Sequence, residues 1–151
     1  MRCLVLALLL ACSGCQHSGL QVKQIAAPDY PVEANARNIQ GMVQVKVSIG
    51  ADGKVLFAKG SGAHPILVQA AEENARQWIF GPFPAVAEFP IDYTITYIYR
   101  LQGKPLSVMV HPTVKTYLPE RVEIQAVPFE SDYPPLDTYR PIPKLGSEPK
   151  K

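Results

Sequence analysis

Strict alternation of apolar and polar residues marks residues 41–49 of the chain. Four apolar residues fall on one side of an extended backbone: Val43, Val45, Val47 and Ile49. Alternation of this kind is typical of a strand with one buried face. Asp52-Gly53 follows, a dipeptide that favours the positive φ of a tight turn, and residues 55–57 resume the apolar pattern. We expect a β-hairpin here.

Two more patterns predict a main helix and a third strand. Apolar residues between 66 and 78 recur at the spacing of one helix face: Leu67, Ala71, Ala75 and Trp78. Pro65 suits the first turn, and the sequence GPFP at residues 81–84 ends the helix. Residues 91–101 alternate in β-branched and aromatic types, which favour a half-buried strand.

The predicted fold class is α+β, with one main helix across a three-stranded antiparallel sheet. A short N-terminal helix is expected at residues 32–37, and residues 59–65 are expected to be a loop. We divide the chain into a signal or lipoprotein-like segment, a tether, a folded domain and a proline-rich, partly disordered extension: residues 1–15, 16–24, 25–102 and 103–151.

The extension differs in composition from the rest of the chain. It carries nine of the fifteen prolines. Residues 106–112 and 121–129 are candidates for short strands, and the second alternates well. Prolines recur every few residues from 131 to 151, which predicts an extended or disordered tail.

The first fifteen residues have the pattern of an export signal. One arginine precedes an apolar run at residues 3–11. Nine helical residues span about 14 Å, half of a hydrocarbon core of roughly 30 Å, so a cleaved signal is favoured over a membrane anchor. Ser13-Gly14-Cys15 resembles a bacterial lipoprotein cleavage site, which makes Cys15 the expected lipidated residue, with Cys12 as the rival.

Charge and cysteine content exclude several classes of protein. The net charge of +2 argues against a dedicated nucleic-acid binder, which needs a clustered basic face. All three cysteines lie within the first fifteen residues, so the folded part has neither a disulfide nor a thiolate metal site.

Candidate catalytic residues are few. His64 and His111 lie in loops without a partner in the sequence, and Glu72 and Glu73 point about 100° apart on a helix. The glycines at 60 and 62 lack the lysine and hydroxyl of a phosphate loop. We expect no enzymatic activity, no cofactor, no metal and no small-molecule substrate.

An ordered set of motifs resembles the C-terminal domain of the TonB family. It comprises Tyr30-Pro31, Ala36, Gly41, the alternating strand, Asp52-Gly53, Trp78, Phe80 and Pro82. The resemblance implies a periplasmic domain that binds an extended peptide of an outer-membrane transporter by strand addition. It places the partner-binding edge on the last strand, at Tyr93, Ile95, Tyr97, Tyr99, Leu101 and Gln102.

Two features depart from the energy transducers of that family. The apolar run is short and contains no histidine, and residues 16–27 reach at most about 40 Å. Two hypotheses therefore remain. One is a TonB-like component that engages a transporter peptide. The other is an envelope lipoprotein with a structural or assembly role. Both imply a lipid-anchored periplasmic protein; Gln16 after Cys15 favours the outer membrane, and the inner membrane stays open.

Overall fold

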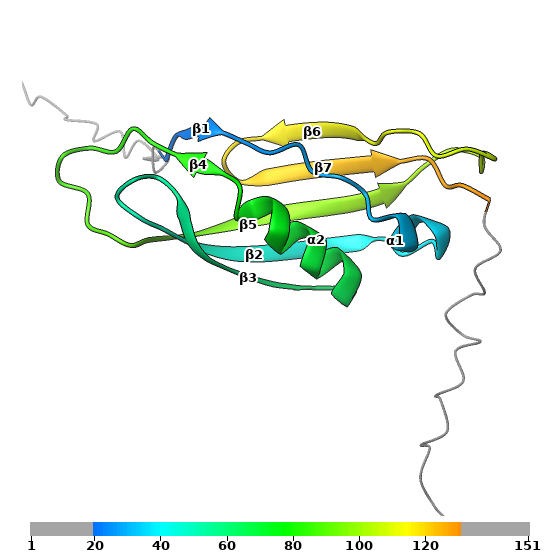
Figure 1. Ribbon diagram of the computed structural model, residues 1–151, viewed down its shortest axis with the longest axis horizontal. Coiled ribbons are helices and arrows are strands. Elements are labelled where there is room, and N and C mark those ends of the chain that lie inside the picture. The colour runs from blue at the N-terminus through cyan, green and yellow to red at the C-terminus, as the bar shows by residue number, and fades with distance from the viewer. Residues whose placement is uncertain (1–19, 131–151) are drawn as a thin grey trace, which may run out of the picture.

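The computed structural model describes residues 20–130, which form an α+β fold (Figure 1). Nine elements follow one another along the chain: β1 (Val22–Gln24), α1 (Val32–Ala36), β2 (Gly41–Ile49), β3 (Val55–Gly62), α2 (Pro65–Ala75), β4 (Ile79–Phe80), β5 (Ile91–Leu101), β6 (Thr113–Tyr117) and β7 (Arg121–Ala126). No helix within this range is long and apolar enough to cross a bilayer.

The main sheet has five strands in the order β3-β2-β5-β7-β6. The expected three-stranded antiparallel sheet is present as β3-β2-β5, but β7 adds to β5 in parallel and β6 pairs antiparallel with β7. The prediction of three strands is therefore wrong in number, and the sheet is mixed. Strand β3 also runs on to Gly62, through residues expected to be a loop.

The core lies between the sheet and α2, which packs on β2 and β3 (Figure 1). The predicted helix face is fully buried at Leu67, Ala71 and Ala75, and Trp78 follows the helix into the core. Gly60 of β3 permits the close approach of the helix. A Cβ at this position would lie 2.8 Å from Cγ1 of Val68, too close for any real side chain.

A second, two-stranded sheet forms where a tether was expected. Strand β1 pairs antiparallel with β4, with Val22 opposite Phe80. The N–H of Gly81 donates to the carbonyl of Gln21 at 2.9 Å. The ordered fold therefore begins before residue 25, because the residues just upstream are held by the segment that follows α2.

The proline-rich extension, which the sequence analysis separated from the folded domain, contributes side chains to the core. Val122, Ile124 and Ala126 of β7 are buried, as their alternation predicted. The side chain of Asn35 in α1 bonds to the backbone of Val127 and Phe129. Residues 106–112 form no strand; Leu106 makes one isolated bridge. The expected tail at 131–151 and the signal at 1–15 lie outside the described residues.

Candidate functional site

The predicted binding edge of β5 is largely occupied by the chain itself. Strand β7 pairs with β5 from Thr96 to Leu101, and the N–H of Gln102 donates to the carbonyl of Ala126 at 2.9 Å. The expectation that this strand leaves a free edge is therefore wrong over residues 96–102. The apolar alternation of β7 explains the outcome, because pairing with β5 places Val122, Ile124 and Ala126 in the core.

The side chains assigned to partner selectivity are mostly in the core. Ile95, Tyr97 and Tyr99 are at most 1% exposed. Tyr97 donates its hydroxyl to Oδ1 of Asn74 at 3.0 Å, and burial raises its pKa well above the usual range. Tyr93 and Leu101 are half-buried and Gln102 is exposed. The structure brings these residues together as one strand, but not as an exposed binding surface.

The opposite border of the sheet, at β3, is covered by side chains of α2. Oε1 of Glu72 accepts the N–H of Gly60 at 2.6 Å, and the Arg76 guanidinium donates to the carbonyl of Ala58 at 3.2 Å. The two side chains also form an ion pair at 3.1 Å. The hydrogen bond from the Gly60 backbone, together with Arg76, lowers the pKa of Glu72. The outward backbone groups of β3 are thus already satisfied at these positions.

One part of β5 remains unpaired, and we call residues 91–95 the open stretch. Strand β5 has eleven residues, whereas β7 pairs only from Thr96 onward. The N–H of Thr96 donates to Glu120 on the β7 side. Because backbone groups alternate in direction along a strand, those of Asp92 and Thr94 face the same side. Within residues 20–130 no strand pairs with them there.

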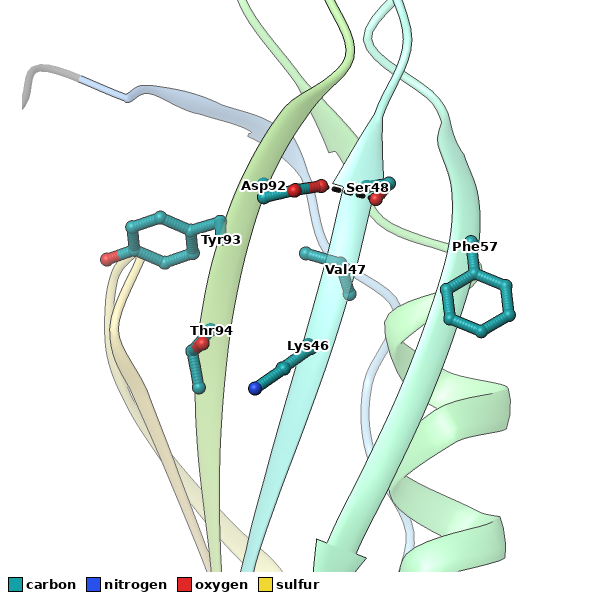
Figure 2. A pocket seen from close by; sticks show the side chains of 7 residues that line it. All are labelled: Lys46, Val47, Ser48, Phe57, Asp92, Tyr93 and Thr94. Atoms are coloured by element: carbon teal, nitrogen blue, oxygen red, sulfur yellow. Dashed lines mark hydrogen bonds between the residues drawn. The ribbon is translucent and has the colours of Figure 1, made fainter.

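A pocket of about 530 Å³ lies beside the open stretch, on the face of the sheet away from α2 (Figure 2). Lys46 extends toward Thr94, and Ser48 donates to the carboxylate of Asp92. Phe57 of β3 stands at the far side and is 59% exposed. The pocket therefore combines a cation, a carboxylate and an apolar ring next to unpaired backbone.

A second lysine, outside the lining of the pocket, lies on the neighbouring strand and also interacts with the Glu72 carboxylate. Lys46 and Lys59 are directly opposite each other in the β2–β3 ladder. Like charges at such a position repel each other and weaken the sheet, unless an anion lies close by. Tyr93 flanks the same region; its burial and the nearby Glu120 carboxylate raise the pKa of its phenol.

Sequence reasoning missed the pocket residues Lys46, Phe57, Asp92 and Thr94. The alternation in the strands did place Lys46, Asp92 and Thr94 on the polar face, whereas Phe57 lies in an apolar run. What was missing was the register, which sets Thr94 beside Lys46 and Asp92 beside Ser48. Register depends on which strands pair, so a single strand pattern contains no direct signal for it.

The residues weighed as catalytic have structural contacts. Nδ1 of His64 accepts the N–H of Ile66 at 3.3 Å and caps α2. Glu72 holds the β3 edge, and Glu73 accepts from Gln69 on the exposed side of the helix. His111 lines a surface pocket beside Asn35. Residues 20–130 contain no group of three or more His, Cys, Asp or Glu side chains able to hold a metal ion.

The fold and the partly open β5 strand define a small α+β module whose unpaired backbone is suited to adding a strand. A family model, the C-terminal domain of Gram-negative bacterial TonB proteins, matches residues 26–101, about half of the chain. The chain belongs to this family. The TonB family acts in the cell envelope, and its members generally interact with outer-membrane receptors. Comparisons with the curated proteins and with the solved structures found no match.

Proposed function

We propose that the protein is a non-enzymatic binding module of the periplasm. In this proposal it adds an extended segment of an outer-membrane transporter to the open stretch of β5. The observation that carries the proposal is the offset between β5 and β7. It leaves the outward backbone groups of Asp92 and Thr94 unpaired beside a lined pocket, while β3 is covered by Glu72 and Arg76.

The length of the open stretch sets the size of the ligand. Five residues in extended conformation span roughly 17 Å, so the bound segment is about four to five residues long. Backbone hydrogen bonds to Asp92 and Thr94 would supply affinity. Alternate side chains of the ligand would lie over the pocket, next to Thr94 and within reach of the Lys46 ammonium.

Strand β6 offers the other unpaired border of the sheet in the described part of the chain. It pairs only with β7, and Val114 and Thr116 direct their backbone groups outward. Its exposed lysine at 115 is typical of an edge protected against strand addition. The open stretch is therefore the better docking position, and β6 is the natural control.

The test is site-specific photocrosslinking in intact cells. A crosslinking side chain is placed at Thr94, with a matched control at Thr116 of β6 and another at Gln69 on the exposed face of α2. We expect Thr94 alone to capture an outer-membrane transporter. Capture at Thr116 but not at Thr94 contradicts the proposed docking position, and capture of no transporter at any position contradicts the proposed function.

A proline substitution sharpens the test. Thr94→Pro removes an N–H that faces away from β2, so the ladder to β2 keeps its hydrogen bonds. We expect it to abolish capture from a crosslinker placed at Asp92, while Thr116→Pro leaves capture unchanged. Equal thermal unfolding midpoints of the two variants would show that the effect is not a loss of folding.

One observation favours the second candidate function, a structural or assembly role in the envelope. Strand β7 fills the larger part of the β5 edge, so a ligand has only five residues to pair with. Capture from Thr94 of an envelope protein other than a transporter, in cells that still import transporter substrates normally, would support this alternative.

A further inference from the structure

The connection between β4 and β5 exposes an unusually apolar surface. Residues 82–90 read PFPAVAEFP, and Glu88 is the only charged residue among them. Val86 is 87% exposed and Phe89 is 37% exposed. The rings of Phe83 and Phe89 pack edge to face at 5.0 Å, so the two aromatic residues form one unit. We call residues 82–90 the apolar loop.

The backbone of the apolar loop has fewer free N–H donors than an ordinary loop of nine residues. Pro82, Pro84 and Pro90 have no N–H, and the N–H of Ala87 donates to the carbonyl of Pro84 at 3.0 Å. An apolar environment penalises every unsatisfied backbone donor. This loop therefore transfers from water to a lipid interface at a lower cost than an ordinary loop of the same length.

The apolar loop lies at the end of the molecule where the described chain begins (Figure 1). The connection is direct, because Gly81 donates to the carbonyl of Gln21 at 2.9 Å and β4 pairs with β1. The loop's first residue therefore cannot move far from residue 21 while the two-stranded sheet is intact. The C-terminal ends of β5 and β7 lie at the opposite end of the sheet.

The sequence predicts a membrane attachment a few residues upstream of Gln21. A lipid on Cys15, a lipid on Cys12 and an uncleaved apolar anchor all place hydrocarbon at or before residue 15. Six residues from 15 to 21 span at most about 20 Å when fully extended. Each alternative therefore holds the apolar loop close to a bilayer surface.

We propose that the apolar loop inserts Val86 and Phe89 into the lipid–water interface of the membrane to which the N-terminal segment is attached, while Phe83 packs between Phe89 and the core. A single weak attachment gives marginal membrane binding, and a second apolar contact strengthens it and fixes the orientation of the domain. The contact is independent of transporter binding. Because residue 91 directly follows the loop, insertion of the loop would also place the start of β5 close to the membrane surface.

The test uses the full-length protein in proteoliposomes of zwitterionic phospholipid containing brominated acyl chains. The Val86→Trp variant reports contact of the loop with the acyl region through bromine quenching of indole fluorescence. The matched control is Val108→Trp, because Val108 is 66% exposed and lies in the connection at the other end of the sheet. The native Trp78 is 1% exposed and gives a common background.

We expect quenching of the indole at position 86 to exceed that at position 108 by at least about threefold, independently of salt, because the contact is apolar. Adding Phe89→Ser should substantially reduce the quenching at position 86. Equal quenching at both positions overturns the proposal. The proposal is also overturned if a protein partner covers position 86 in cells and the indole at this position is not quenched in lipid vesicles. Neither result affects the crosslinking test at Thr94.

Discussion

At the scale of single residues, the Asn74 side chain connects α2, the main sheet and the chain between β1 and α1. Its Oδ1 accepts from Trp78 Nε1 and from the Tyr97 hydroxyl, both at 3.0 Å, and its Nδ2 donates to the carbonyl of Ala26 at 3.1 Å. The helix periodicity did not identify it, because an asparagine beside an apolar stripe has the pattern of a solvated residue. Its role depends on two aromatic donors that only packing brings together.

Replacing Asn74 with Ala should strongly destabilise the fold. The substitution leaves the indole N–H and the Tyr97 hydroxyl buried without an acceptor, and we expect a loss of about 2–4 kcal/mol in the free energy of unfolding. Urea denaturation measures the loss. Gln69→Ala is the control, because Gln69 is exposed and its side chain bonds to the exposed Glu73, and it should change stability by less than about 0.5 kcal/mol. Equal effects of the two substitutions would contradict the buried network.

Buried tyrosines predict alkaline unfolding. Burial raises the pKa of Tyr30, Tyr97 and Tyr99 above the ordinary value of 10.0. Above pH 10 the unfolded chain loses these protons while the folded chain retains them. The contribution of these tyrosines to the free energy of unfolding is therefore fully present below pH 10. It falls as the pH rises, by up to about 1.4 kcal/mol per pH unit for each tyrosine. Denaturation curves between pH 8 and pH 11.5 test this.

Tyr99→Phe provides the matching variant. Among the described residues, the Tyr99 hydroxyl is buried without a hydrogen-bond partner. Removing it should leave stability at pH 7 unchanged or slightly raised and make the alkaline loss less steep. A variant that loses stability at pH 7 and keeps the full alkaline slope would contradict this assignment.

At the scale of elements, β7 changes the character of the sheet. It converts a three-stranded antiparallel sheet into a mixed one and covers six residues of the strand that resemblance assigned to a partner. The family match ends at residue 101, so the strand that closes this edge lies beyond the part of the chain shared with the family. The alternation at residues 121–129 predicted a strand, but nothing in that pattern specified its neighbour.

The importance of β7 is measured by truncating its core side chains. Ile124 of β7 and Ile95 of β5 are both 0% exposed. We expect Ile124→Ala and Ile95→Ala each to cost about 2–5 kcal/mol, as buried aliphatic truncations do. Gln125→Ala on the exposed side of β7 is the control. A cost below about 0.5 kcal/mol for Ile124→Ala would show that β7 is only loosely attached and that the β5 edge is accessible.

At the scale of the whole molecule, the proposed membrane-contacting loop and the proposed docking stretch follow each other along the chain. The apolar loop ends at Pro90 and the open stretch of β5 begins at Ile91. Membrane attachment at one end of the fold and strand addition beside it would place the ligand close to the bilayer. The uncovered face of the sheet, with Lys46 and Lys59, then lies next to the same ligand.

Attachment of the N-terminal segment to the membrane is itself testable. We expect labelling of the protein by radioactive palmitate, accumulation of its precursor with the signal peptidase inhibitor globomycin, and loss of both with Cys15→Ser. Cys12→Ser is the matched control and should leave labelling unchanged. Labelling that survives Cys15→Ser and disappears with Cys12→Ser would move the lipid to Cys12, and no labelling in either background would contradict a lipoprotein.

The sequence by itself located the main helix and the central strands of the fold, but not β1, β4 or β6. Residues 91–101, the hairpin around Asp52-Gly53 and the stripe from Leu67 to Ala75 were located correctly, because alternation and helical spacing are local properties of the chain. Only the tertiary structure decided which edge remains open. Strand pairing joins residues far apart in sequence, so the closure of β5 at Thr96, the covering of β3 by Glu72 and Arg76, and the pocket at Lys46 depend on register and packing.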